Sequence, residues 1–195
     1  LARRLGYVYV NTGAMYRAVT WLVLRVGVDP ADPQAVERLL ETSRFEADVI
    51  DGQSCFKVEG IDPGEALVDE SINGAVSKIA AISAVRSCLV EMQRQYGLRC
   101  HSVMEGRDIG SAVFPQTPHK FYIDASIEVR VARRLGQGIT DSVALRDAMD
   151  SARKSSPLTI PRDAVLIDSS HKEVGQVVEE LLAHLKPRGI APVAD

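Results

Sequence analysis

Residues 7–17 read YVYVNTGAMYR. Residues 7–10 predict a short buried strand, and residues 14–26 predict a mostly apolar helix that carries Tyr16 and Arg17 in its first turns. In open α/β sheets the ligand crevice lies beyond the carboxyl ends of the strands. We therefore expect Arg17, placed at such a junction, to face a ligand rather than the core.

Two further segments carry arginine beside a predicted strand or helix. EGRDIG at residues 105–110 begins at the end of a predicted strand over 102–105, and RDAMDSAR at residues 146–153 lies in a predicted helix over 142–153. The planar fork of arginine binds phosphate through two hydrogen bonds at once. Together with Arg17, these segments predict a phosphate and nucleotide site.

Each segment also has a purely structural interpretation. Arg146, Asp150 and Arg153 stand at i, i+4 and i+7 on one helix face, where a surface ion pair would contribute only roughly 0.2–0.5 kcal/mol. Arg107 and Asp108 could form a local ion pair at the strand end. We favour a ligand site for Asp108, because buried polar groups demand partners and a ligand can supply one.

The rest of the chain alternates strands with helices. Strands are predicted over 120–123 and 164–167, and helices over 34–41, 128–135 and 174–185. Within residues 43–98, strands over 45–50 and 55–59 flank the hairpin signal Asp51-Gly52, and helices follow over 72–81 and 84–96. The sequence thus predicts an α/β fold in one domain, with a parallel sheet, a small antiparallel lobe and a frayed tail at 187–195.

Composition narrows the class of protein. The net charge of −3, with acids and bases interleaved, gives no basic stripe for nucleic acid. No apolar run approaches the roughly 18 residues that span a bilayer, and the first residues do not resemble a secretory signal. The three cysteines lack CxxC spacing and the histidines lack i, i+4 pairing, so we expect no disulfide framework and no protein-bound metal. These features predict a cytoplasmic protein without nucleic-acid or membrane partners. We expect it to be a monomer, although composition does not determine the oligomeric state.

Several segments resemble bacterial cytidylate kinase (CMP/dCMP kinase), occur in that family's order and span nearly the whole chain. They are TGAMYR at 12–17, VSKIAA at 76–81 with Val85-Arg86, EGRDIG at 105–110, HKFY at 119–122, and Arg146-Asp147, Asp150-Ser151 and Arg153 with SPL at 156–158. The resemblance implies a P-loop nucleoside monophosphate kinase-like fold within residues 1–195, with a parallel sheet flanked by helices. It places the core at about 1–42 and 99–195, an NMP-binding insertion at about 43–98, and a short lid at about 136–160.

The resemblance also implies an activity. The protein would be a transferase that moves the γ-phosphoryl group of ATP, with Mg²⁺, to CMP or dCMP in pyrimidine nucleotide metabolism, giving ADP and CDP or dCDP. Such a reaction needs little covalent help from the protein and depends on positioning and positive charge. Thr12 and Arg17 would hold the α-phosphate of the acceptor, with Arg107 beside them.

The same resemblance assigns the acceptor base to three residues. Ser77, Arg86 and Asp108 would line the cytosine pocket, where Asp108 would accept a hydrogen bond from the exocyclic amine. Alternatively, Ser77 could be a small residue where helices pack, and Arg86 could belong to a solvated helix face.

The residues of the predicted 142–153 helix would meet the rest of the nucleotide. By the same resemblance, Arg146 and Asp150 would contact the ribose, and Arg153 would move with the lid to the phosphates. Arg146 and Arg153 are therefore the candidate catalytic residues.

The sequence departs from the family's pattern in three places. It contains no GxxxxGK[ST] phosphate-binding loop, Asn11 stands where the family more often has Asp, and the stretch 135–146 is short. Residues 3–6, RRLG, are typical of a helix end, and we expect an upstream strand and loop. Two alternatives stay open: a kinase for another nucleoside monophosphate, or a catalytically inactive nucleotide-binding fragment.

Overall fold

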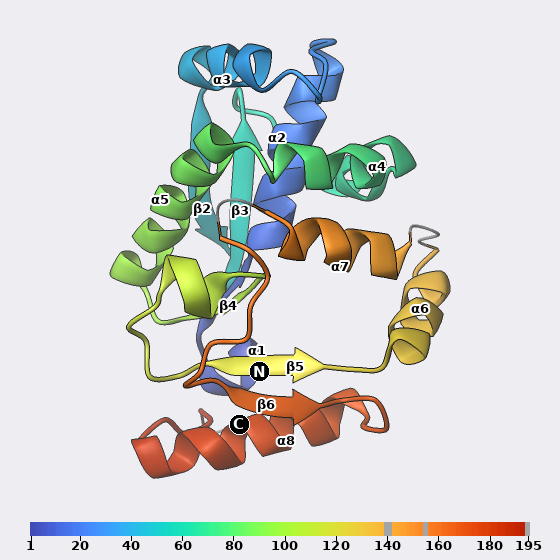
Figure 1. Cartoon of the computed structure of the whole chain (residues 1–195). Helices are drawn as coiled ribbons and strands as arrows, with labels where there is room; N and C mark the ends of the chain where they lie inside the picture. Colours follow the sequence, from blue (N-terminus) through green and yellow to red (C-terminus); the bar gives the residue numbers. More distant parts are fainter. Residues whose placement is uncertain (139–141, 154–155, 194–195) are drawn as a thin grey trace.

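A computed structural model describes residues 1–138, 142–153 and 156–193, without the side chain of Arg146. Two β-sheets form its framework (Figure 1). The larger sheet consists, in spatial order, of β2 (Phe45–Ile50), β3 (Gln53–Val58), β1 (Val8–Asn11) and β4 (Ser102–Glu105). The smaller sheet pairs β5 (Phe121–Asp124) with β6 (Val165–Asp168).

Helices connect and cover these strands (Figure 1). The α-helices are α1 (Ala2–Leu5), α2 (Thr12–Arg25), α3 (Pro33–Thr42), α4 (Glu70–Ile79), α5 (Ser83–Arg99), α6 (Ile127–Gly136), α7 (Val143–Ser151) and α8 (Val174–Leu185). Two short 3₁₀-helices are η1 (Gly64–Val68) and η3 (Lys186–Arg188), and η2 (Ile109–Val113) is a short π-helix.

Strand pairing confirms the predicted α/β fold class. β1 is parallel to both β3 and β4, and β5 is parallel to β6. β2 and β3 are antiparallel and are joined by a turn in which Asp51 and Gly52 have positive φ angles of 50° and 73°. Such φ angles are typical of the type I′ hairpin turn that an Asp-Gly pair favours.

The junction between β1 and α2 forms as residues 7–17 predict, with the strand shifted by one residue and the helix start shifted by two. The helix begins at Thr12, two residues earlier than expected, because the Asn11 side chain accepts a hydrogen bond from the Ala14 N–H at 2.9 Å. This N-cap satisfies a backbone donor that the first turn of a helix leaves without a partner. Residues directly after the strand are therefore held at its carboxyl end.

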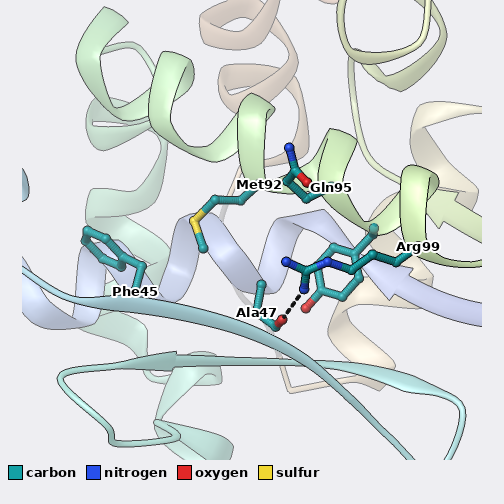
Figure 2. A pocket seen from close by; sticks show the side chains of 6 residues that line it. Phe45, Ala47, Met92, Gln95 and Arg99 are labelled. Atoms are coloured by element: carbon teal, nitrogen blue, oxygen red, sulfur yellow. Dashed lines mark hydrogen bonds between the residues drawn. The ribbon is translucent and has the colours of Figure 1, made fainter.

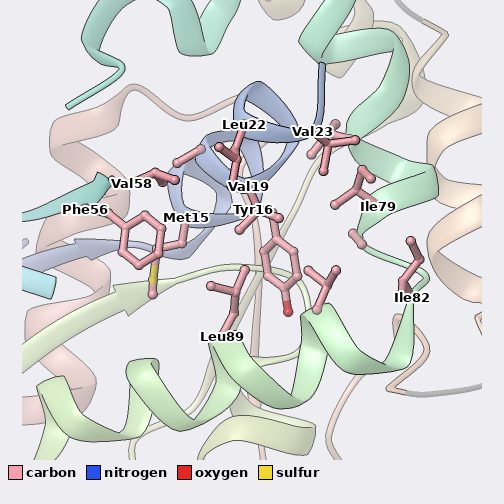
Figure 3. Packing of buried hydrophobic residues seen from close by; sticks show 14 of the residues in the cluster. Met15, Tyr16, Val19, Leu22, Val23, Phe56, Val58, Ile79, Ile82 and Leu89 are labelled. Carbon is pink, nitrogen blue, oxygen red and sulfur yellow. The ribbon is translucent and has the colours of Figure 1, made fainter. Parts of the chain in front are cut away.

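The main hydrophobic core lies between α2, the larger sheet and the helices α4 and α5. Figure 3 shows Met15, Val19 and Val23 of α2 in this cluster, with Leu89 of α5 and Ile79 of α4 nearby. Each of these side chains is at most 1% exposed. Full burial of such a side chain contributes about 1.5–3 kcal/mol, so this cluster anchors α2 and α5 beside the strand ends.

A second core joins α8 to the smaller sheet and to α1. Leu5 packs with Leu182 and Leu185 of α8, and Gly6 ends α1 with a φ angle of 65°. The predicted helix end at residues 3–6 is therefore confirmed. The prediction of a frayed tail is wrong as far as Val193, whose N–H donates to the Arg4 carbonyl oxygen at 2.9 Å.

The sheet is divided in two between β4 and β5. Within the described residues no strand joins them, and residues of both strands line a cavity of about 1320 Å³. Alternation of strands and helices predicts parallel pairing, but it does not specify which strands become neighbours. Among the described residues, no helix is both long and apolar enough to cross a membrane.

Candidate nucleotide site

The carboxyl ends of β1 and β4 lie side by side, because Asn11 is paired in register with Glu105. Thr12 donates a hydrogen bond from its Oγ1 to the Glu105 carbonyl oxygen at 2.8 Å. A Cβ atom at the next residue, Gly106, would lie 2.3 Å from that hydroxyl oxygen. The absence of a side chain at Gly106 thus allows the EGRDIG loop to approach the start of α2.

Replacing Gly106 with alanine should therefore disturb the site. The new methyl group would displace Thr12 and break its hydrogen bond, and we expect a loss of about 1–3 kcal/mol in the free energy of unfolding. Thermal melting measures this loss. The matched control is Gly175→Ala in α8, where no atom lies within 4 Å of the new Cβ. A melting temperature for Gly106→Ala equal to that of the control would contradict the tight approach.

Arg17 reaches the same strand ends from α2. Its Nη1 lies 3.1 Å from the position that a Cβ at Gly13 would occupy. Burial raises the pKa of the Glu105 carboxyl, and the positive charge of Arg17 opposes this shift. Arg17 therefore lies close to the end of β4, where the sequence predicts a phosphate ligand.

Arg86 and Asp108 form a buried ion pair behind the EGRDIG loop. Their side chains are 3% and 5% exposed, and a second Arg86 nitrogen, Nη1, donates to the Ala80 carbonyl oxygen at 3.2 Å. Burial raises the pKa of the Asp108 carboxyl, while the charges of Arg86 and Arg153 oppose that shift. The alternative interpretation of Arg86 as part of a solvated helix face is therefore wrong.

A second network of charges connects the loop after β4 to α6 and α7. Arg107 Nη1 lies 3.0 Å from Asp147 Oδ1 and 3.5 Å from Asp150 Oδ2. Asp147 also accepts a hydrogen bond from Arg130, and Asp150 accepts one from Arg153. Burial opposes ionisation of Asp147, but hydrogen bonds from Arg130 and Arg107 outweigh it and lower the pKa of this carboxyl. Arg107 thus pairs with α7, and Asp108 pairs with Arg86 instead of with Arg107.

The remaining predicted residues fall around this network. Ser77 is 9% exposed in α4, which contacts both α2 and α7. Arg153 follows α7. Burial raises the pKa of both Asp108 and Tyr16, and the positive charge of Arg153 opposes this rise at both residues. The side chain of Arg146 lies outside the described residues. The other predicted site residues lie on α2, α4, α5 and α7, directly after α7, or in the loop that follows β4.

Residue-by-residue reasoning missed two members of this site. Asp147 bridges two arginines, and its only signal in the sequence is its position inside the RDAMDSAR segment. Arg130 lies in α6, where arginine is an ordinary surface residue, and nothing in the local pattern marks it. Only the docking of α6 beside α7 brings Arg130 to the site.

The large cavity between the two sheets opens onto these charges. Glu105, Arg107 and Asp108 line it from the side of β4, and Arg130 and Asp147 line it from α6 and α7. A cavity of about 1320 Å³ exceeds the roughly 300–1,000 Å³ of ordinary small-ligand pockets. It is therefore large enough to take a nucleotide against the arginine side chains.

A smaller cavity of about 160 Å³ lies between β2 and α5 (Figure 2). Phe45, Met92 and Arg99 contribute to its lining, and Arg99 donates to the Ala47 carbonyl oxygen at 3.4 Å. The Tyr96 hydroxyl beside it lies within hydrogen-bond distance of two backbone carbonyl oxygens, and burial raises the pKa of Tyr96 to about 12. None of the predicted site residues lines this cavity, so it is separate from the nucleotide site.

Comparison with known proteins decides the family. Residues 1–187 match the family model described as cytidylate kinase. The chain belongs to the cytidylate kinase family. The cytidylate kinase of Clostridium botulinum (strain Loch Maree / Type A3) is 36% identical over 197 residues, covering 95% of this chain and 89% of that protein. That of Mycobacterium avium (strain 104) is 39% identical over 193 residues, covering 93% and 85%.

A third relative has similar identity and coverage. The cytidylate kinase of Solibacter usitatus (strain Ellin6076) is 37% identical over 201 residues, covering 96% of this chain and 85% of that protein. The similarity to these cytidylate kinases therefore extends over nearly the whole chain. Family membership also confirms the resemblance drawn from the sequence segments.

Proposed function

We propose that the protein transfers the γ-phosphoryl group of ATP to CMP or dCMP, giving ADP and CDP or dCDP. The observation that carries this proposal is the buried Arg86–Asp108 pair at the end of β4. A buried carboxylate needs hydrogen-bond donors. The Asp108 carboxylate can accept more hydrogen bonds than the one from Arg86, so a ligand can donate another. Cytosine offers an exocyclic amine, whereas uracil offers a carbonyl oxygen at the same position.

Residues around this pair complete the acceptor site. Asp108 would accept from the cytosine amine, and Arg86 and Ser77 would address the remaining edge of the base. Thr12 and Arg17 would bind the α-phosphate, because both follow the carboxyl end of β1 at the start of a helix, where anions are favoured.

The charges on α7 would change partners when nucleotide binds. In this structure Asp147 and Asp150 form ion pairs with Arg107, Arg130 and Arg153. Phosphate oxygens would compete with these carboxylates for the same guanidinium groups. Once released, Arg107 would contact the acceptor phosphate. Arg153 would stabilise charge on the moving phosphoryl group, and Asp150, with Arg146, would be free to meet the ribose.

ATP and Mg²⁺ would enter from the large cavity, which Arg130 and Arg133 line, and the donor phosphates would compete with Asp147 for Arg130. Mg²⁺ keeps most of its waters and binds mainly through substrate phosphates and one or two carboxylates. Among the described residues there is no group of three or more His, Cys, Asp or Glu side chains placed to hold a metal. The ion would therefore neutralise phosphate charge as part of the bound nucleotide.

The three cysteines are free thiols, which supports a reducing compartment such as the cytoplasm. We expect the protein to work there as a monomer, without nucleic-acid or membrane partners.

Calorimetry on the 195-residue chain tests the acceptor site. CMP and dCMP should bind at least about tenfold more tightly than UMP, because uracil would turn a carbonyl oxygen toward Asp108 and leave a buried acceptor without a donor. GMP and AMP, with larger bases, should bind more weakly still. Equal affinity for CMP and UMP would contradict the proposed role of Asp108, and preference for a purine would favour the alternative of a different monophosphate kinase.

A further inference from the structure

Unpartnered polar atoms cluster behind the Arg86–Asp108 pair. Among the described residues, no hydrogen-bond partner with good geometry faces the buried Tyr16 hydroxyl, either amide atom of Gln93 or the Nε of Arg86. Gln93 is 1% exposed and Tyr16 is 8% exposed. Each buried polar atom without a partner costs about 1–3 kcal/mol, so a cluster of them needs a physical reason.

The geometry joins these groups into one chain of contacts. Gln93 stands seven residues after Arg86 in α5, so both side chains leave the same face of that helix. The Tyr16 ring lies between α2 and α5, with its hydroxyl toward α5 (Figure 3). Gln93 is near enough to this hydroxyl to affect its pKa, which burial raises, and the Arg86 guanidinium carbon lies 5.6 Å from the Tyr16 ring centroid.

A purely structural role does not account for glutamine at this position. Leu89 and Tyr96 belong to the apolar core and stand four residues before and three residues after Gln93, on the same side of α5. A leucine at position 93 would fill a similar volume there without burying two polar atoms. Rotation of the terminal amide, which is a soft torsion, would let Gln93 bond the Tyr16 hydroxyl. The hydroxyl would then be fixed, and with it the ring that faces Arg86.

We propose that Gln93 is a positioning residue that sets the base selectivity of the acceptor site through Tyr16 and Arg86. Gln93 holds the Tyr16 hydroxyl, the Tyr16 ring supports the Arg86 guanidinium, and Arg86 keeps the Asp108 carboxylate aimed at the base. This inference rests on the proposed function, because it requires a cytosine nucleotide in the pocket. It adds a determinant of specificity that lies outside the pocket itself.

Calorimetry with CMP and UMP on Gln93→Leu, Tyr16→Phe and the double variant tests this inference, with thermal melting measured in parallel. Gln93→Leu should bind CMP about five- to tenfold more weakly, the equivalent of one hydrogen bond, and should narrow the CMP/UMP affinity ratio. Its melting temperature should change by no more than a few degrees, because the variant loses the contact with the Tyr16 hydroxyl but no longer buries the polar amide. The double variant should be no worse than either single one, since both residues act through one contact.

Gln95→Leu on the same helix is the matched control, because Gln95 bonds only Glu91 at the surface and should leave CMP affinity unchanged. Wild-type CMP affinity in Gln93→Leu would overturn the inference while leaving the proposed function intact. Weaker binding accompanied by a large fall in melting temperature, or by fully additive losses in the double variant, would also overturn it. Failure of the unsubstituted chain to bind CMP would refute the proposed function, and the inference with it.

Discussion

Arg153→Ala should lower kcat for ATP:CMP phosphotransfer by about 10²–10³-fold while changing the affinity for CMP far less. Arg153 now bonds Asp150 and lies near Asp108, at the end of the α7 segment that we propose to move over the substrates. A charged group that reaches the phosphates only when the site closes contributes mainly to the transition state. The assay uses a form of the protein that carries a GxxxxGK[ST] loop, with CMP affinity measured separately by calorimetry.

Two companion variants make the Arg153 result interpretable. Arg153→Lys keeps the positive charge but loses the planar fork, so its kcat should fall between those of the alanine variant and the unsubstituted protein. Arg4→Ala removes an arginine from an exposed pair with Glu179. Neither residue lines the large cavity, so this variant should leave kcat unchanged. A kcat for Arg153→Ala equal to that of the unsubstituted protein would remove Arg153 from the mechanism.

Asp108→Ala should have the largest effect on stability, because it leaves the Arg86 charge buried and uncompensated. Breaking a buried ion pair in this way costs about 3–5 kcal/mol, against about 0–1 kcal/mol for an exposed pair. The melting temperature should therefore fall by roughly 10 °C. Glu179→Gln, which breaks the exposed pair with Arg4, is the control and should shift the melting temperature by no more than a few degrees.

Asp108→Asn tests the selectivity for CMP over UMP without leaving a cavity, because asparagine has nearly the same volume as aspartate. The asparagine amide can donate as well as accept, so it can meet the uracil carbonyl that the carboxylate repels. CMP affinity should fall and the CMP/UMP affinity ratio should narrow by at least about tenfold. A folded Asp108→Asn protein that keeps the unsubstituted ratio would show that Asp108 does not contact the base.

The strand–helix junctions could be predicted from the sequence because their signals are local. Apolar runs, the Asp51-Gly52 turn and the capping residue Asn11 act within a few positions of the chain. Each predicted helix and strand therefore begins within two residues of its predicted first residue. The carboxyl ends of β1 and β4 meet in register, so the segments 11–17 and 105–110 lie together, and Arg107 pairs with Asp147 of the segment 146–153.

The partners of those arginines could not be predicted, because they depend on tertiary packing. The pairing of Arg107 with Asp147, rather than with its neighbour Asp108, requires α7 to lie over the loop after β4. The burial of Arg86 depends on how α5 packs on α2, which a helical pattern alone does not specify. Gln93 carries no signal in the sequence for the same reason, since a glutamine inside an α-helix is ordinarily at the surface.

The most direct test of phosphoryl transfer to cytosine nucleotides is an acceptor panel. Formation of ADP and of each nucleoside diphosphate is measured by chromatography with ATP, Mg²⁺ and CMP, dCMP, UMP, AMP or GMP, using the form that carries a GxxxxGK[ST] loop. We predict that CDP and dCDP form in equal amounts with ADP, at a kcat/KM at least about tenfold above that for any other acceptor. ADP formation without CDP, or a faster reaction with UMP or a purine nucleotide, would contradict the proposed function.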